Sequence, residues 1–474
     1  MTDAHVPLPP PPAAFTSQVH AALKAWNATP DAGATLDDLY LVQLELAGGA
    51  TNARRAANQV LLSALNALAA AHDREATLLR MRFLEGKPMH AAANRFNASE
   101  PSLYRWQSQG IERLAALLWQ MESQALEQRR AELETRLEPP GYLRLFGVAT
   151  HQAALLDLLC SQAPPFVVSI GGIGGIGKTS LADAVLRAAI RQQPHGDVAW
   201  VSARQQRLDL AGQLHSVPQP ALTVDALLEA LAVQLLPGAP RFTAEERAIA
   251  ALRAHCARQP TMLVVDNLET AADVDSLLPM LRRLADPAKV VLTTRHSLFG
   301  EPGVFHFQTP ELSEPDALAL ARLEAEQRNL PELSRASDAE LHPLYETVGG
   351  NPLAIRLVVG QLHVHSLAGI LADLAAARGQ PIENLYTYIY WTAWNRLGEL
   401  ARRALLAMPL VTERGGSLDY LAQVSGLDPG RLSGVLAELV ALNLVDSRGD
   451  LHQRRYTIHA LTRSFLLEQV ARWL

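Results

Sequence analysis

A glycine-rich segment near the middle of the chain restricts the fold more than any other feature. Residues 171–180 read GGIGGIGKTS. They match the pattern G-x4-G-K-[ST] through Gly172, Gly177, Lys178 and Thr179. An apolar, β-rich run (166–170) precedes the segment and a helix-forming stretch (180–187) follows it. This strand–loop–helix order is typical of a P-loop, which gathers backbone N–H groups and a helix N-terminus around phosphates. It favours a nucleoside triphosphate site over a glycine turn that binds nothing.

The residue types of this loop have distinct expected roles. Glycines permit positive φ angles and let the main chain approach a ligand closely. Lys178 is expected to neutralise the β- and γ-phosphates, and Thr179 to supply a hydroxyl to Mg²⁺. The loop residues predicted to bind nucleotide are Gly172, Gly174, Gly175, Ile176, Gly177, Lys178, Thr179 and Ser180.

Composition narrows the cellular setting. The formal net charge of −6 provides no global attraction to nucleic acid, so any such binding must come from a local patch. Cys160 and Cys256 are the only cysteines, which suggests a reducing cytosol and excludes a zinc site built mainly on thiolates. The proline-rich start lacks the order of a signal peptide, and no run approaches 18 apolar residues. We therefore expect a cytoplasmic protein without a membrane partner.

The N-terminal part is expected to be helical. Residues 1–15 are predicted to be a disordered tail, and residues 16–138 an all-α domain with a linker helix. Within residues 72–119 a short helix, a three-residue turn and a longer helix follow one another, which is the spacing of a helix-turn-helix. This stretch resembles the DNA-reading region 4 of bacterial sigma factors. The residues placed to reach DNA are Ser99, Ser102, Tyr104, Arg105 and Gln107.

The charge of this stretch supports DNA binding only weakly. Basic residues in 72–119 barely outnumber acidic ones, and Glu100 begins the supposed recognition helix, where phosphate would repel it. A helical adaptor that has lost contact with DNA therefore stays open as an alternative. The apolar stripe that continues along the same helix either serves a dimer or covers the next domain.

Three further apolar runs belong with the P-loop in a domain of residues 141–310. Residues 197–203 are predicted to be a buried strand, and 261–266 end in Asp266, as a Walker B strand does. Asp266 is expected to hold Mg²⁺. Arg295 follows the strand at 289–294 and is expected to face the γ-phosphate. Since no Asn-Lys-x-Asp string for guanine occurs, adenine is the preferred base.

Five ordered strings make the resemblance to a family specific. They are GGIGGIGKTSLA, VAWVSA, MLVVDN, KVVLTTR and GGNPLAI. Together they resemble the motifs of the NB-ARC (AP-ATPase) family of STAND-class P-loop NTPases, over residues 142–470. The resemblance implies an α/β P-loop core with a parallel sheet flanked by helices, then a helical domain (311–384) and a winged-helix domain (385–474). It also implies a switch that is closed with ADP and open and oligomeric with ATP.

Two C-terminal residues take expected roles from this resemblance. Pro352 stands in the string GGNPL, which matches the motif whose proline packs near adenine. His459 stands where the family has the histidine of its MHD motif, which contacts the β-phosphate of ADP. The motif's aspartate is replaced by Ala460, so the strength of autoinhibition is open.

Departures from the family affect catalysis and base recognition. Asn267 follows Asp266 where relatives often have a second acidic residue, and an amide cannot act as a base. Glu269 is the possible substitute. With Lys178 and Asp266 it completes the predicted catalytic set, and slow ATP hydrolysis is expected. The adenine-flanking element lacks its usual arginine, so contacts from Phe146 and Val148 would rest on backbone.

The resulting hypothesis is an ATP- or ADP-binding, Mg²⁺-dependent switch that regulates transcription through DNA. The alternative is a signalling or defence scaffold whose N-terminal helices recruit a protein effector. A constitutive ATPase motor is a weaker third hypothesis, which Asn267 disfavours. No repeat of solenoid period occurs in residues 311–474, so sensing is assigned either to a separate partner protein or to a short switch type.

Overall fold

The computed structural model describes most of the 474 residues. The described residues are 11–27, 36–193, 196–203, 206–208, 214–216, 223–268, 271–362, 365–375, 394, 397–411, 415–442, 444–449, 453–458, 462 and 466. The chain divides into two compact units, Met1–Glu132 and Leu133–Leu474. Residues 1–10 of the predicted tail (1–15) lie outside the described residues, as do Glu269 and His459, whereas Phe15 is buried and begins a helix.

The first unit is all-helical, as predicted. Its elements are α1 (Phe15–Lys24), α2 (Tyr40–Ala47), α3 (Ala53–Leu79), a π-helical turn (Arg80–Leu84), α4 (Met89–Phe96) and α5 (Glu100–Glu134). The non-helical backbone of His72 kinks α3 where the predicted helix-turn-helix begins. Asn97, in the left-handed conformation at φ 47°, ends α4 and makes the tight turn before α5. Unit 1 ends within α5, before the predicted stop at Pro139-Pro140.

A buried carboxylate joins α2 to α5. Glu122 is only 3% exposed, and its two oxygens accept hydrogen bonds from the backbone N–H groups of Tyr40 (2.7 Å) and Leu41 (3.1 Å). Both donors belong to the first turn of α2, where N–H groups have no partner inside the helix. Glu122 therefore does the work of an N-cap from a distant helix.

Replacing Glu122 with alanine is expected to destabilise the first unit by about 2 kcal/mol, because two buried donors lose a charged acceptor. Thermal unfolding followed by circular dichroism would measure the effect. Glu127→Ala, at an exposed site of the same helix, is the matched control. Equal melting temperatures for the two variants would show that the cap contributes nothing.

The second unit is built on a parallel sheet of five strands. These are β1 (Val167–Gly171), β2 (Asp197–Ser202), β5 (Thr261–Leu268), β6 (Lys289–Thr294) and β7 (Val304–Gln308), in the order β2-β5-β6-β1-β7. All neighbouring pairs are parallel. β1 leads into the P-loop and lies beside β6, so the carboxyl ends of β1, β5 and β6 meet at one edge of the sheet. Ligands bind at this edge in open α/β sheets.

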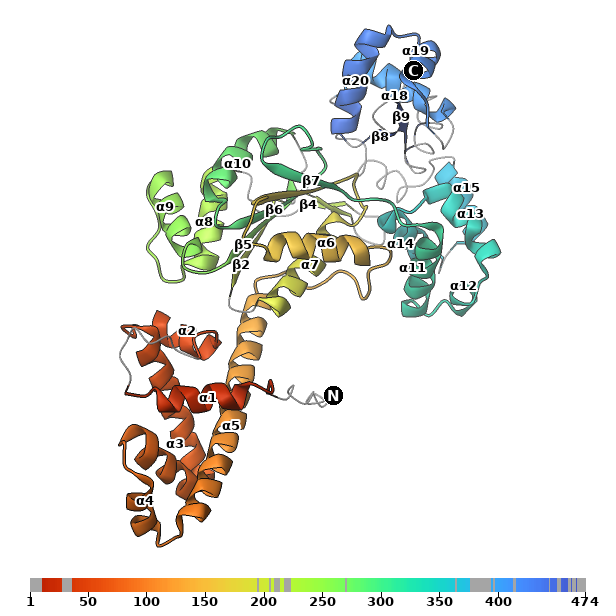
Figure 1. The fold of residues 1–474 in the computed structure, drawn as a ribbon. Helices are drawn as coiled ribbons and strands as arrows, with labels where there is room; N and C mark the ends of the chain where they lie inside the picture. Colours follow the sequence, from red (N-terminus) through yellow and green to blue (C-terminus); the bar gives the residue numbers. More distant parts are fainter. Residues whose placement is uncertain are drawn as a thin grey trace. The chain divides into compact units, whose positions relative to one another are not determined.

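Helices cover both faces of this sheet (Figure 1). One face packs against α6 (Ala149–Cys160) and α7 (Lys178–Gln192). The other packs against α8 (Val224–Leu235), α9 (Glu245–Cys256) and α10 (Ala271–Leu284). Successive strand residues alternate between the two cores: Val290 and Leu292 face the second, Val291 the first. This burial on both faces explains why the strands read as continuous apolar runs. The predicted α/β P-loop fold with flanking helices is confirmed.

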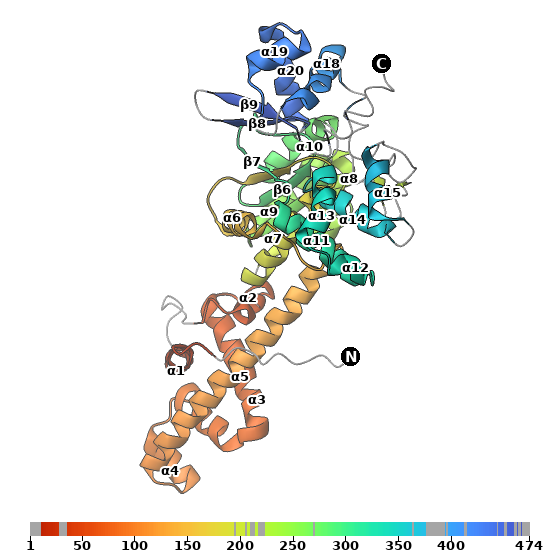
Figure 2. The ribbon, with the colours of Figure 1, turned by 90° about the vertical axis from the view of Figure 1, so that its right-hand side faces the viewer.

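The remaining elements follow the sheet in the chain (Figure 2). Among the described residues α11 (Glu314–Gln327), α12 (Pro331–Ser334), α13 (Asp338–Val348), α14 (Pro352–Gln361) and α15 (Leu367–Ala375) come first. Then come α18 (Glu399–Ala407), a 3-10 turn (Met408–Leu410), α19 (Leu418–Ser425), α20 (Pro429–Ala441) and the antiparallel pair β8 (Asp446–Gly449) and β9 (Arg454–Thr457). Ser313, Ser417 and Asp428 cap α11, α19 and α20. A short hairpin of β3 (Gln206–Leu208) and β4 (Leu214–Ser216) was not predicted.

No helix within the described ranges is both long enough and apolar enough to cross a membrane.

Candidate nucleotide-binding site

The P-loop backbone has the conformation that phosphate binding needs. Gly172, Gly175 and Gly177 have φ angles of 148°, 77° and 104°, which side chains disfavour. α7 begins directly after the loop, and no side chain caps its N-terminus. The first N–H groups of α7 are therefore available to an anion, and the helix dipole favours negative charge there.

The P-loop lysine is held by its own loop. Lys178 is buried, and its Nζ donates to the carbonyl oxygens of Gly172 (2.9 Å) and Ile173 (2.8 Å). These neutral acceptors keep the ammonium group beside the loop. Phosphate oxygens would form stronger, charge-assisted hydrogen bonds with the same group.

The predicted Walker A and Walker B residues meet. Thr179 donates its hydroxyl to Asp266 Oδ1 over 2.7 Å, and Thr293 donates to the same oxygen over 2.6 Å. Asp266 is fully buried at the carboxyl side of β5. Two hard oxygen ligands, from a hydroxyl and a carboxylate, thus converge beside the phosphate loop. Such ligands fit Mg²⁺, which is usually held by one or two protein oxygens, phosphates and water.

Asn267 fixes the orientation of Asp266. Its Nδ2 donates to Asp266 Oδ2 (2.8 Å), while its backbone N–H donates to Thr293 Oγ1 (2.8 Å). Asn267 has φ 64°, a left-handed conformation that asparagine tolerates better than most residues, and the register of β5 and β6 shifts there. The side chain after the Walker B aspartate is therefore a hydrogen-bond donor to that aspartate. It supplies no general base.

A cavity of about 570 Å³ joins the phosphate-side residues. It is lined by Gly174, Gly175, Gly177, Lys178, Thr179 and Ser180 of the loop, together with Asn267, Arg295 and Pro352. Arg295, from the end of β6, is half-buried and shares the cavity with Lys178. The structure thus brings the predicted γ-phosphate sensor to the predicted phosphate site.

A second, smaller cavity of about 80 Å³ adjoins the first. Its lining includes Phe146, Val148, Ile176 and Pro352, all predicted to contact the nucleotide. Tyr142, Gly177, Ser180, Pro352 and Arg356 line both cavities. The smaller cavity is mostly apolar and opens beside the phosphate loop.

The GGNPL segment packs directly on the P-loop. Asn351 is fully buried, and its Nδ2 donates to the carbonyl oxygen of Gly174 (3.1 Å). The N–H of Leu353 donates to the carbonyl oxygen of Gly175 (3.2 Å). The same asparagine caps α14 by accepting from Ala354 N. The start of α14 is thereby tied to the loop that would hold phosphate.

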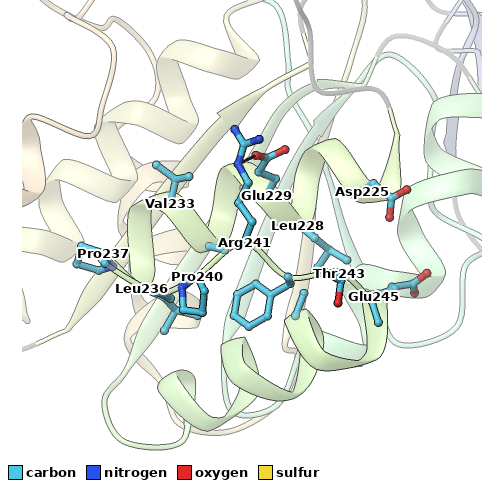
Figure 3. Close-up of a pocket in the computed structure, with 16 residues that line it drawn as sticks. Asp225, Leu228, Glu229, Val233, Leu236, Pro237, Pro240, Arg241, Thr243 and Glu245 are labelled. Carbon is cyan, nitrogen blue, oxygen red and sulfur yellow. Dashed lines mark ion pairs between the residues drawn. The ribbon is translucent and has the colours of Figure 1, made fainter.

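Another pocket, of about 470 Å³, lies between α8 and α9 (Figure 3). Arg241 lies across it in an ion pair with Glu229 (3.1 Å), and both side chains are exposed. No P-loop residue lines it. It therefore does not form part of the candidate nucleotide site.

The predicted DNA-contacting residues lie on and beside the first turns of α5. Ser99, Tyr104 and Arg105 are exposed, with Tyr104 at 54%. Ser102 is half-buried, and its hydroxyl lies 3.0 Å from that of Ser99. Gln107 is half-buried, with its Oε1 covered by protein. Three of the five side chains are therefore open to a partner.

Four site residues were not predicted from the sequence: Tyr142, Asp183, Asn351 and Arg356. Asp183 is only 6% exposed, accepts a hydrogen bond from Tyr142 and lines the phosphate-side cavity. A carboxylate within the apolar stretch LADAV, one helical turn after Thr179, was the available signal. For Arg356 the available signal was likewise its position, one helical turn after the predicted residue Pro352.

Comparisons with known proteins add a regulatory context. No family model matches the chain. Over 439 residues it is 26% identical to the regulatory protein AfsR of Streptomyces coelicolor, an alignment that covers 85% of this chain and 41% of that protein. It is also 26% identical to AfsR of Streptomyces griseus over 308 residues, or 63% of this chain and 29% of that protein. The chain thus spans less than half the length of these relatives.

Solved structures match about three quarters of the chain, and only loosely. The Aeropyrum pernix ORC1 protein in complex with DNA matches with a TM-score of 0.32 and 18% identity, over 73% of this chain and 98% of that chain. The ADPNP–ADP complexes of the ORC2 protein from the same organism match with a TM-score of 0.33 and 14% identity, over 72% and 98%. The fold class follows instead from the P-loop and the strand order. The chain is similar in sequence to regulatory proteins and has the α/β core of a P-loop NTPase.

Proposed function

We propose that this chain is an adenine-nucleotide-dependent regulatory switch of the NB-ARC type, which binds ATP or ADP with Mg²⁺. The observation that carries the proposal is the convergence of Lys178, Thr179 and Arg295 on one cavity, with the buried Asp266 hydrogen-bonded to Thr179. The apolar cavity beside it, with Phe146 and Pro352, supports adenine as the base. Similarity to regulatory proteins supports a switch rather than a metabolic enzyme.

Several groups in and beside the P-loop would bind the phosphates together. The open N–H groups of α7 and the ammonium of Lys178 bind the phosphate oxygens. Thr179 Oγ1 and Asp266 Oδ1 would hold Mg²⁺, whose charge offsets that of the phosphates. Arg295 is the cation that distinguishes a third phosphate from two. A nucleotide can shift a conformational equilibrium only through such a difference in affinity.

Hydrolysis is expected to be slow. A water molecule attacking the γ-phosphate needs a group that orients it or accepts its proton. Asn267 cannot accept a proton, and its amide is engaged with Asp266. Nucleotide occupancy, rather than turnover, is then the output of the site.

The test of this proposal is the nucleotide that copurifies and its effect on assembly. Nucleotide extracted from the pure protein is identified by chromatography. Molecular mass is then measured by light scattering with ADP and with a non-hydrolysable ATP analogue. We expect bound ADP in a monomer and a larger assembly with the analogue. A protein that binds neither nucleotide would refute the proposal, and an unchanged mass would refute assembly on activation.

For the output we propose DNA binding through residues 72–119, supported by the exposed Tyr104 and Arg105 near the start of α5. A gel shift with genomic fragments, in ADP and in the analogue, tests it. Arg105→Ala should weaken binding several-fold and lower its salt dependence. Arg241→Ala, a 91% exposed arginine of the second unit, is the control. Absence of DNA binding in both nucleotides would favour the scaffold that recruits a protein effector.

A further inference from the structure

The segment that joins α5 to α6 forms a wall of the nucleotide cavity. Residues 138–142 line the phosphate side. Residues 142–146, with Val148, line the adjoining apolar side. This segment is also the covalent connection between the N-terminal helices and the P-loop domain. We call residues 138–142 the linker wall.

The P-loop helix holds the linker wall from one side. Tyr142 donates its hydroxyl to Asp183 Oδ2 over 2.6 Å. Arg187 Nε lies within hydrogen-bond distance of both oxygens of Asp183 (3.0 and 2.9 Å), and its Nη2 donates to the carbonyl oxygen of Glu138 (2.8 Å). Asp183 lies one helical turn after Thr179 on α7. The group that holds the wall and a residue expected to contact Mg²⁺ therefore move together.

Helix α14 holds the linker wall from the other side. Arg356 Nη1 donates to the carbonyl oxygen of Gly141 over 3.1 Å. Its Nε lies 2.8 Å from Glu324 Oε1, and Glu324 is only 6% exposed. Arg356 lies one turn after Pro352 and is the charged residue among those that line both cavities. The wall is thus tied to both helices whose first residues border the cavity.

We propose that the linker wall couples nucleotide occupancy to the N-terminal helices, with Tyr142 as its positioning residue. This inference rests on the proposed nucleotide-binding function. A bound nucleotide contacts a cavity that is complete only when the wall is docked, so docking strengthens binding. By thermodynamic linkage the nucleotide must then hold the wall in its docked position to the same degree. α5 ends at Glu134, just before the wall, and Arg187 also pairs with Glu134 (3.7 Å), so the residue that holds the wall also contacts the end of α5.

The hydrogen bond from Tyr142 is not expected to change with pH near neutrality. Burial raises the pKa of the Tyr142 phenol well above its usual range, and the hydrogen bond to Asp183 raises it further. The phenol therefore stays protonated and donates to the carboxylate under all working conditions. Phenylalanine removes this donor and little else.

The test compares Tyr142→Phe with Tyr420→Phe. Tyr420 donates its hydroxyl to the carbonyl oxygen of Leu410 (3.2 Å) in the C-terminal helices, far along the chain from the cavity residues, and is the matched control. Affinity for ADP is measured by calorimetry. Trypsin cleavage after Arg136 is followed by mass spectrometry with and without ADP, because Arg136 is held by Asp197 and by the carbonyl oxygen of Val198, so cleavage there requires local opening of the segment.

For wild type and Tyr420→Phe, ADP should slow this cleavage. For Tyr142→Phe we expect ADP binding to be about tenfold weaker, the lower end of the effect of one hydrogen bond to a charged group. At saturating ADP, trypsin should still cleave the segment faster in Tyr142→Phe than in wild type. Destabilisation elsewhere in the protein would not produce this result. Unchanged affinity and unchanged protection in Tyr142→Phe would overturn the proposal.

The two proposals fail in different ways. If wild-type protein binds no nucleotide, the proposed function is wrong and the coupling falls with it. If wild-type protein binds ADP but the segment is cleaved at the same rate in its presence and absence, the function stands and only the coupling is wrong. The melting temperature of Tyr142→Phe without nucleotide, compared with that of Tyr420→Phe, shows whether the variant folds.

Discussion

Lys178→Ala is expected to weaken binding of ADP and of a non-hydrolysable ATP analogue by a factor on the order of 100 or more, which corresponds to about 2.7 kcal/mol. Lys178 is the first residue of α7, and its ammonium group lies beside the phosphate loop. Alanine removes the charge-assisted hydrogen bonds that this group would form with phosphate. The loss of stability without nucleotide should be smaller than this loss of binding, because the loop carbonyl oxygens that accept from Lys178 are neutral and a phosphate is charged. Calorimetric titration of purified, nucleotide-stripped protein measures the change.

Lys24→Ala is the matched control, because Lys24 is exposed in the last turn of α1. It removes the same charge from the chain without touching the P-loop. We expect wild-type affinity for this variant. If Lys178→Ala kept its normal nucleotide content after purification, the phosphate site would have to lie elsewhere. A loss of affinity that grows from ADP to the ATP analogue would place the lysine near the terminal phosphate.

Local sequence signals predicted most elements of the fold. The P-loop strand was expected at 166–170 and is found at Val167–Gly171, and the strand expected at 197–203 is Asp197–Ser202. Both are apolar runs bounded by turn residues, so their own residues determine them. β7 was missed, because VFHFQ places a histidine and a glutamine among apolar residues at a half-exposed sheet edge. Its identity as a strand depends on pairing with β1, which the local sequence does not encode.

The same distinction applies to the site. Lys178 and Thr179 were predicted because one motif fixes their spacing, and Asp266 because it ends an apolar run; the structure brings Thr179 and Asp266 within hydrogen-bond distance. The contacts of the linker wall were not predicted. Tyr142 and Asp183 are 41 residues apart, and Gly141 and Arg356 are 215 apart. No periodicity relates such residues, and only the folded chain brings a backbone carbonyl to a particular arginine.

Gly175→Ala is expected to destabilise the second unit by about 2–3 kcal/mol even without nucleotide. A Cβ at this position would lie 2.6 Å from the Cβ of Leu353 and 3.0 Å from the Oδ1 of Asn351, in a backbone with φ 77°. The helix start and the loop would have to separate, which breaks the hydrogen bond from Leu353 N to Gly175 O. The midpoint of thermal unfolding should fall accordingly.

Gly177→Ala separates this steric effect from backbone strain. Gly177 has φ 104°, at least as unfavourable for alanine, but a Cβ there would meet no atom within 4 Å. Its cost in nucleotide-free protein should therefore be the strain alone, about 1 kcal/mol. In a Leu353→Gly background the clashing Cβ is gone, so the added cost of Gly175→Ala should fall toward that of Gly177→Ala. If both glycine variants lowered the free energy of unfolding equally in the wild-type background, the start of α14 would not pack tightly against the P-loop. The contact between Gly175 and α14 could then not transmit a change at the phosphate site to the C-terminal helices.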